Sequence, residues 1–318
     1  MVNTISGQRI LIAVLDWGLG HAARSMALAI QLRQNGNTIF WAAAGKAKAL
    51  LLRDCPSETV ATLTPYAIRY DGPNMHLNIA RQLPKIWRTI RREQREVDQL
   101  VSDYAIDLLI SDSRFGAYSR RCHSVLLTHQ LQPIFGVPLA QSIYQRWLNR
   151  FDAFWIPDLP PPADLSGQLS QPFASAKSVH YVGWLSRLLP FWNTSLPKSF
   201  DTVCLLSGPE PARTQLQRQL IAQLQDRAGT HIIIQGLPDQ KNEEKQLGHC
   251  QIIPYTNGPP TAYYLQSANR IICRSGYSTI MDLAVLGLLD RATLIPTPGQ
   301  TEQEYLAQRI GSWTASGW

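Results

Sequence analysis

Short, continuous runs of apolar residues recur along the first half of the chain, and each ends at a polar or glycine-containing turn. They cover residues 10–15, 38–42, 107–111, 124–128 and 153–156. Runs of this length without polar alternation are typical of strands buried on both faces of a parallel sheet. Between the first two runs, apolar residues recur at helical spacing from Ala22 to Leu32 and stop before Gly36. The pattern predicts a β-α-β unit that opens a doubly wound α/β domain.

This alternation stops at a proline-rich stretch and then restarts. Prolines interrupt residues 157–197, although 179–182 still fits a strand. Further strand-like runs cover 202–206, 231–235, 251–253, 270–273 and 294–295, and helical patterns cover 212–225 and 278–286. Because the connection falls near 186–197, we expect two Rossmann-like doubly wound α/β domains, 1–188 and 189–318.

The composition is that of a folded protein. Apolar residues make up 45% of the 318 positions and charged residues 17%, unlike a disordered chain. No apolar run approaches the roughly 20 residues that span a bilayer, and the run at 9–15 is too short for a signal peptide. The five cysteines are odd in number and include no C-x-x-C pair, which favours reduced thiols over disulfides or a zinc site. We therefore expect a cytoplasmic protein.

The chain has a net charge of +7, and its basic residues are densest in one segment. Residues 79–95 combine a basic series with apolar residues, Trp87 among them, at helical spacing. This pattern predicts a basic amphipathic helix, which suits either an anionic membrane surface or an ordinary solvated face. A peripheral location on the inner face of the membrane is therefore an alternative. The basic and aromatic residues form no recognisable nucleic-acid-binding motif, so nucleic acid is not expected as a partner.

Ligands of open parallel sheets bind where strands end, so the residues after the predicted strands are the candidates for chemistry. The first turn places Gly18, Gly20 and His21 at the start of a helix, which suits a phosphate or a developing anion. The turn lacks the third glycine of G-x-G-x-x-G and the lysine of a P-loop, which disfavours a hydride-transferring enzyme. His21 is either a general base or a residue that caps the helix. Asp112 and His129 follow two later strands and are the other candidates for the base.

A second strand-to-helix turn contains Arg274, Ser275 and Gly276. Its backbone amides suit a diphosphate, and Ser278 or a neighbouring hydroxyl is expected to cap the helix. Asp282, one turn further along, either accepts hydrogen bonds from ribose hydroxyls or stabilises the helix dipole.

Two stretches resemble the motifs of one enzyme family. They are D-W-G-L-G-H-A-A-R at 16–24, and C-R-S-G-Y-S-T-I-M-D-L at 273–283 followed by I-P-T-P-G-Q-T-E-Q-E-Y at 295–305. Together they are similar to glycosyltransferase family 28, the group that contains the peptidoglycan lipid-linked N-acetylglucosaminyl transferase. The segments S-D-S-R-F-G at 111–116 and T-H-Q at 128–130 resemble a bacterial subgroup of that family. The resemblance implies the GT-B fold, in which two Rossmann-like domains face a cleft.

The resemblance also implies roles for individual residues. Ser275 and Gly276 would hold the nucleotide diphosphate, and Asp282 takes the place of the family's ribose-binding carboxylate, which is usually glutamate. Tyr255 stands where a residue packs near the uracil, and His21 would lie by the acceptor. The expected donor-binding residues are Gly18, Gly20, Ser207, Gly208, Tyr255, Arg274, Ser275, Gly276, Ser278, Asp282, Gln303 and Glu304, and the catalytic candidates are His21, Asp112 and His129.

The implied reaction moves a hexose or N-acetylhexosamine from a nucleotide sugar, with UDP as the expected nucleotide, to an acceptor hydroxyl. The expected mechanism inverts the anomeric centre. The chain has neither D-x-D nor H-E-x-x-H, so no metal and no cofactor beyond the nucleotide sugar are expected. The acceptor is not identified, and a lipid-linked one is a candidate. Only about a dozen residues follow Tyr305, so the closing helix common in GT-B enzymes is expected to be short or missing.

Two other interpretations stay open at this point. A nucleotide-sugar hydrolase or epimerase has a related two-domain architecture, and the G-x-G-H-x-x-R turn at 18–24 also occurs in such hydrolases. A catalytically inactive protein that binds carbohydrate or lipid could have kept the same fold.

Overall fold

The structure is a computed structural model that describes residues 2–16, 18–66, 75–133, 138–173, 176–193, 195–241 and 243–311. The side chains of 75–81 and 138–140 are not among those described. Trp17 of the first motif, the start of the predicted basic segment at 79–81 and the last seven residues, 312–318, therefore lie outside the described side chains. The chain divides into two compact units, Met1–Leu185 and Ser186–Trp318.

The N-terminal unit is built on a seven-stranded parallel sheet with strand order β3-β2-β1-β4-β5-β6-β7. Its strands are β1 (Arg9–Val14), β2 (Thr38–Ala43), β3 (Val60–Thr62), β4 (Leu108–Asp112), β5 (His123–Leu127), β6 (Ala153–Ile156) and β7 (Ser178–Tyr181). β1 lies between β2 and β4, and Val14 pairs with Asp112. The central strands are almost entirely buried, as their continuous apolar runs predict.

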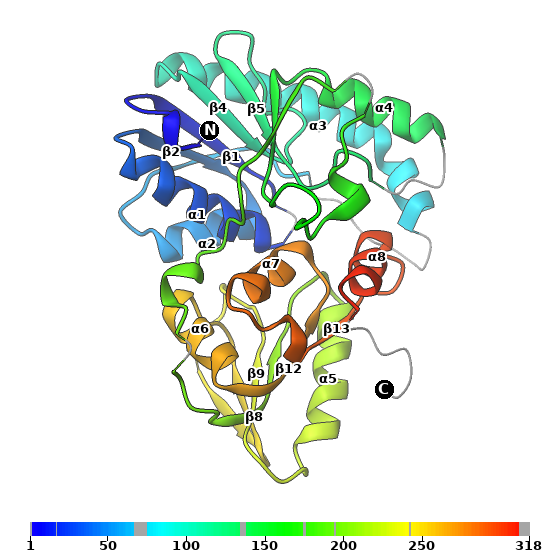
Figure 1. The fold of residues 1–318 in the computed structure, drawn as a ribbon. Coiled ribbons are helices and arrows are strands. Elements are labelled where there is room, and N and C mark those ends of the chain that lie inside the picture. Colours follow the sequence, from blue (N-terminus) through cyan, green and yellow to red (C-terminus); the bar gives the residue numbers. More distant parts are fainter. Residues whose placement is uncertain are drawn as a thin grey trace. The chain divides into compact units, whose positions relative to one another are not determined.

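Helices cover both faces of this sheet, as Figure 1 shows. They are α1 (Gly20–Gln34), α2 (Gly45–Asp54), α3 (Met75–Asp103) and α4 (Pro138–Leu148). Leu11 and Ala13 of β1 pack in one buried cluster with Val97 and Val101 of α3. Because side chains alternate along a strand, the neighbouring residues of β1 point to the opposite face, where α1 and α2 lie in Figure 1. The result is the three-layer α/β arrangement expected for this half.

The C-terminal unit has a six-stranded sheet with order β10-β11-β9-β8-β12-β13. The strands are β8 (Phe200–Leu205), β9 (His231–Ile234), β10 (Lys245–Leu247), β11 (Cys250–Ile253), β12 (Ala268–Arg274) and β13 (Ala292–Ile295). All pairs are parallel except β10 with β11. Its helices are α5 (Ala212–Leu224), α6 (Gly258–Gln266), α7 (Tyr277–Val285) and α8 (Thr301–Ile310).

The core of this unit forms where α5 packs on the sheet. Leu216 and Leu220 of α5 contact a buried cluster that includes Cys204, Ile233 and Ile272. All five cysteines of the chain are free thiols. Burial raises the pKa of the Cys273 thiol to about 12, so this group stays protonated and inert at neutral pH.

Two parallel-rich α/β sheets therefore confirm the predicted fold class. Several short elements have no counterpart in the prediction: β3, β10, α2, α4 and α6. Within the described ranges, no helix combines the length and the apolar character needed to cross a bilayer.

Candidate active site

The candidate catalytic residues lie where β1, β4 and β5 end. β1 and β4 are neighbours in register, so the turn after β1 and the end of β4 share one edge of the sheet. Gly18 in that turn has φ of 84°, a left-handed conformation that glycine adopts without strain. α1 starts two residues later, which makes His21 its second residue. Asp112 is the last residue of β4.

His21 forms a hydrogen-bonded pair with Asp112. Its Nδ1 lies 2.7 Å from Oδ1 of Asp112, whose side chain is fully buried, while 18% of the His21 side chain is exposed. Because the carboxylate oxygen can only accept, Nδ1 carries the proton and donates it. The other ring nitrogen, Nε2, makes no hydrogen bond to any described residue.

Arg24 lies one turn further along α1 and binds the same carboxylate. Its Nε donates to Oδ2 of Asp112 at 2.9 Å, its Nη2 donates to Oδ1, and Ser25 donates its hydroxyl to Oδ2 at 2.8 Å. Burial alone would raise the pKa of Asp112, but the charge of Arg24 and the hydrogen bonds from His21 and Arg24 outweigh it and hold that pKa well below its usual range. Asp112 is therefore an ionised, fixed acceptor at neutral pH.

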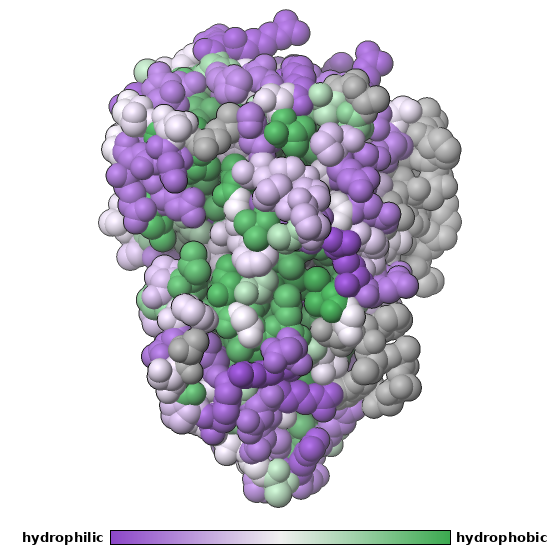
Figure 2. All heavy atoms as spheres, in the orientation of Figure 1, coloured by the Kyte–Doolittle hydropathy of each residue, from purple (hydrophilic) through white to green (hydrophobic). Residues whose placement is uncertain are grey.

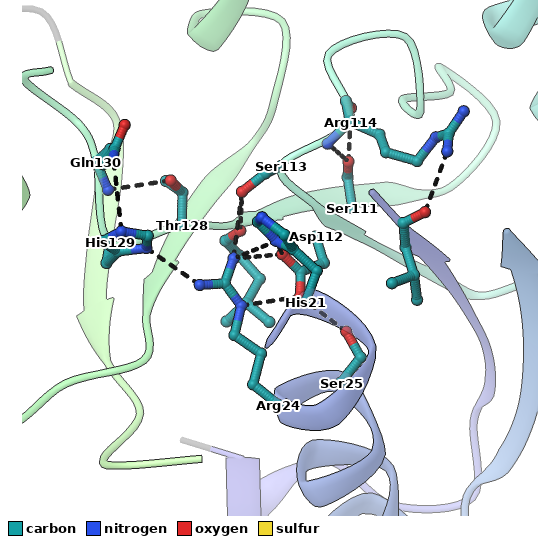
Figure 3. Close-up of polar contacts among 12 residues, drawn as sticks. His21, Arg24, Ser25, Ser111, Asp112, Ser113, Arg114, Thr128, His129 and Gln130 are labelled. Carbon is teal, nitrogen blue, oxygen red and sulfur yellow. Dashed lines mark hydrogen bonds and ion pairs between the residues drawn. The ribbon is translucent and has the colours of Figure 1, made fainter. Parts of the chain in front are cut away.

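His129 joins this cluster through the third nitrogen of the guanidinium. Nη1 of Arg24 lies 3.1 Å from Nδ1 of His129, and 7% of His129 is exposed (Figure 3). The structure thus brings together all three catalytic candidates, His21, Asp112 and His129. Arg24, which connects them, was not among the predicted site residues. Its position three residues after His21 on one helix was the available signal.

A second buried ion pair holds the loop that follows β4. Arg114 pairs with Glu93 of α3, and both side chains are fully buried. Glu93 also accepts the Tyr66 hydroxyl at 2.6 Å and the Gly116 amide at 3.0 Å. Burial raises the pKa of Glu93 despite the adjacent guanidinium. A methyl group on Gly116 would lie 2.5 Å from the carbonyl oxygen of Ile90, so only glycine fits there. The pair fixes the backbone two residues after Asp112.

In the C-terminal unit, Ser275 and Gln303 are in contact. The Ser275 hydroxyl donates to the Gln303 carbonyl at 2.8 Å. Both polar atoms of the Gln303 side chain bond to residues shortly before it in the chain. Its Oε1 accepts the Thr297 amide at 2.8 Å, and its Nε2 donates to Gln300 at 2.5 Å. Glu304 accepts the Gly299 amide at 3.2 Å. These two side chains, from the first turn of α8, therefore hold the turn at 297–300.

The side chain of Arg274 also bonds to neighbouring segments of the chain. Its Nη1 donates to the Pro296 carbonyl at 2.9 Å and its Nη2 to the Ala212 carbonyl at 2.8 Å. Burial lowers the pKa of this guanidinium. The side chain ties the end of β12 to the loops that surround it.

The start of α7 differs from the prediction of a hydroxyl cap. The N-cap residue is Gly276, and no side chain caps the helix, so the prediction that Ser278 or a neighbour does so is wrong. An uncapped helix start leaves amide groups for a ligand and has the positive end of the helix dipole. Gly208, with φ of 102°, lies close to Thr297, because a methyl group on Gly208 would be 3.7 Å from Oγ1 of Thr297. Ser207 precedes it in the loop between β8 and α5.

Asp282 and Tyr255 are each bound by a residue from the start of the C-terminal unit. Ser186 donates its hydroxyl to Oδ1 of Asp282 at 2.5 Å, and Arg187 donates to the Tyr255 hydroxyl at 3.2 Å. Burial raises the pKa of Asp282 to about 6, although the Ser186 hydrogen bond and the Arg187 charge both lower it. On the face drawn in Figure 2, hydrophobic residues gather over α7, the helix that carries Asp282.

The predicted donor residues thus fall into separate groups. One group lies around the turn at 296–300 and the start of α8, and it comprises Gly208, Arg274, Ser275, Gly276, Gln303 and Glu304. Tyr255 and Asp282 are instead linked to 186–187. Gly18 and Gly20 belong to the N-terminal unit. Across the described residues, no cluster of histidine, cysteine, aspartate or glutamate has the arrangement of a metal site.

Known proteins resemble this chain in two ways. The model of the glycosyltransferase family 28 C-terminal domain matches residues 202–315. MurG of Acinetobacter baumannii has the same fold, with a TM-score of 0.52 and 16% identity over 95% of this chain and 82% of that one. LpCGTa in complex with UDP has a TM-score of 0.61 and 15% identity, over 97% of this chain and 86% of that one. UGT2 of Phytolacca americana, complexed with UDP-2fluoro-glucose and pterostilbene, has a TM-score of 0.58 and 14% identity, over 95% of this chain and 83% of that one. No curated protein matches the chain in sequence.

The two α/β units and the family match define the class of this protein: it is a glycosyltransferase of the GT-B fold. Residues 202–315, which contain the second of the two motifs, match the C-terminal domain of glycosyltransferase family 28.

Proposed function

We propose that the protein transfers a hexose or N-acetylhexosamine from a UDP-sugar to an acceptor hydroxyl, with inversion and without a metal ion. The new bond joins the acceptor oxygen to the anomeric carbon, and the bond from that carbon to the diphosphate breaks. The nucleoside diphosphate leaves with the electron pair, and the hydroxyl proton passes to the enzyme. The family 28 match at 202–315 and the GT-B fold support this class of reaction, and the side chains of the two units support the individual roles.

The observation that carries the proposal is the hydrogen bond from His21 to the buried, ionised Asp112. Because Nδ1 carries the proton, Nε2 of His21 has a lone pair for the acceptor hydroxyl. Asp112 stabilises the imidazolium that forms when that proton arrives. His129 is less suited to this role, since its Nδ1 faces the guanidinium of Arg24. We therefore assign the base to His21 and its orientation to Asp112.

The donor site that we propose lies in the C-terminal unit. The uncapped start of α7 at Gly276 offers backbone amides to the diphosphate, with Ser275 and Ser278 beside it. Asp282 would accept hydrogen bonds from the ribose, and Tyr255 would pack near the base. The sugar would be bordered by Ser207, Gly208 and the start of α8, which carries Gln303 and Glu304. In this scheme the N-terminal unit binds the acceptor.

The exposed face of α3 supports a lipid-linked acceptor and a peripheral location on the membrane. Leu83 and Trp87 are 37% and 43% exposed, although the residues around them are not predominantly apolar. The guanidinium of Arg91 lies 3.5 Å from the centre of the Trp87 ring. Exposed basic residues on this part of the helix are Lys85, Arg88, Arg91, Arg92 and Arg95. Aromatic and basic side chains on one surface helix suit the interface of an anionic bilayer.

A panel of UDP-, GDP- and dTDP-sugars tests the function directly. The midpoint of thermal unfolding should rise only with the true donor, because a ligand at a hundred times its Kd stabilises by about 2.7 kcal/mol. Release of the nucleoside diphosphate should then require an added acceptor pool, such as a membrane lipid extract. Rapid release of free sugar, or epimerisation, from the UDP-sugar alone would identify a hydrolase or epimerase instead. If no nucleotide sugar stabilises the protein, a catalytically inactive binding protein is the better interpretation.

A further inference from the structure

Arg24 makes more contacts than neutralising Asp112 requires. Nε and Nη2 already form a two-point pair with the Asp112 carboxylate, and 1% of Arg24 is exposed. The remaining nitrogen, Nη1, is directed to Nδ1 of His129, 105 residues away in sequence. Nη2 additionally donates to the Ser113 hydroxyl at 3.2 Å. The planar guanidinium thus connects α1 with the ends of both β4 and β5 (Figure 3).

The protonation of each histidine follows from these contacts. A guanidinium has donors only, so Nδ1 of His129 must accept from Arg24 and carries no proton. Nδ1 of His21 lies 3.0 Å from Nη2 of Arg24, but also 2.7 Å from an oxygen of Asp112. Two lone pairs at that second distance would repel each other, so Nδ1 of His21 holds a proton, and the two donors share one carboxylate oxygen. The two neutral rings are therefore held in opposite tautomers.

We propose that Arg24 is a positioning residue: it fixes His129 with an unprotonated Nδ1, and it holds the Asp112 carboxylate that in turn fixes His21 with an unprotonated Nε2. His21 then accepts the proton of the acceptor hydroxyl, and His129 has its N–H on Nε2. The amide nitrogen of Gln130 lies 3.4 Å from that Nε2, so this assignment requires the Gln130 amide to be turned over, with its oxygen toward His129. The catalytic consequence rests on the proposed role of His21 as base. The tautomers themselves follow from the contacts of His129 with Arg24 and of His21 with Asp112, whatever the reaction.

A role limited to charge balance makes a different prediction. Lysine would supply the same positive charge to Asp112, but its single ammonium lacks the planar fork that reaches Asp112 and His129 together. Arg24→Lys therefore separates the two explanations. Arg33→Lys is a matched control on the same helix, because Arg33 pairs with Glu58, away from the site.

The test is ¹⁵N NMR of the full chain labelled on its seven histidines, at a pH where the rings are neutral. His21→Gln and His129→Gln assign the signals. In the unsubstituted protein we expect His129 to be protonated on Nε2 and His21 on Nδ1. In Arg24→Lys the His129 signals should move to values averaged over both tautomers, and kcat should fall roughly 100-fold with an unchanged KM for the nucleotide sugar. Arg33→Lys should change neither.

Two results would overturn the inference. One is a His129 that is protonated on Nδ1, or averaged between tautomers, in the unsubstituted protein, a measurement that needs no variant of Arg24 to fold. The other is an Arg24→Lys protein with unchanged tautomers and kcat. Fixed tautomers in a protein that transfers no sugar would instead contradict the proposed function and leave the assignment of Arg24 intact.

Discussion

Replacing Asp282 by asparagine should make the protein more stable and weaken its binding of nucleotide. The carboxylate accepts the Ser186 hydroxyl, and burial raises its pKa from 3.8 to about 6. The ionised form is therefore disfavoured in the folded state relative to the unfolded chain. Asparagine keeps an oxygen for the hydrogen bond from Ser186 and carries no charge, so it removes this cost. Such a conflict between stability and binding is typical of functional sites.

The size of the effect follows from the pKa. The difference between 3.8 and about 6 corresponds to about 3 kcal/mol, since a tenfold change in an ionisation equilibrium equals 1.36 kcal/mol. Because the folded-state pKa is raised, the wild-type protein loses stability as pH rises through this interval. The gain from Asp282→Asn should accordingly be near zero below pH 4 and reach its maximum, at most about 3 kcal/mol, above pH 7.

The opposite sign is expected for ligand binding. A hydrogen bond from a ribose hydroxyl to a charged group contributes about 1.5–3 kcal/mol, so the Kd for UDP should rise about 10- to 100-fold in Asp282→Asn. In the wild-type protein, UDP binding should weaken as pH falls through about 6, because Asp282 becomes protonated. Urea unfolding across the pH range and calorimetry with UDP measure the two effects.

Asp239→Asn is the matched control, since Asp239 is exposed in the same unit. It should change neither stability nor UDP binding. The reasoning is refuted if Asp282→Asn is less stable than the wild type at pH 8, or if its gain in stability does not depend on pH.

Three further changes test other parts of the structure. Gly116→Ala should lower the free energy of unfolding by about 1–3 kcal/mol, because the new methyl group would lie 2.5 Å from the Ile90 carbonyl oxygen; an unchanged urea midpoint would contradict this. Ser186→Ala removes a hydrogen bond that lowers the pKa of Asp282, so the pH midpoint of UDP binding should move above about 6; a midpoint that stays in place or falls speaks against the contact. Arg88→Glu combined with Arg92→Glu should reduce co-sedimentation with vesicles that contain anionic lipid and should not change co-sedimentation with neutral vesicles. Failure of the wild type to bind anionic vesicles would exclude the membrane surface as a partner.

The sequence predicts the two α/β halves well because their strands are buried on both faces. The run at 153–156 coincides with β6, and the helix expected to end before Gly36 is α1. β10 could not be found this way, since all three of its residues are exposed and carry no hydrophobic pattern. β3 is also three residues long, too short for any periodicity to emerge.

The site was predicted in part. The meeting of His21, Asp112 and His129 follows from the rule that ligands bind where parallel strands end. Arg24 was missed because an arginine on a helix is usually solvated, and its carboxylate partner lies 88 residues away in sequence. Gln303 and Arg274 look like ligand-binding side chains, yet their polar groups bond to nearby loops. Residue type alone does not separate these two uses.

The central claim is that His21 is the base of a sugar transfer, and the turnover of His21→Ala tests it most directly. With the true donor and acceptor, kcat should fall by a factor of about 10² to 10⁴, the usual contribution of a general base. The Kd of the nucleotide sugar should stay unchanged, because the proposed donor residues that surround Asp282 and Gly276 are untouched. Full turnover in His21→Ala would contradict the account.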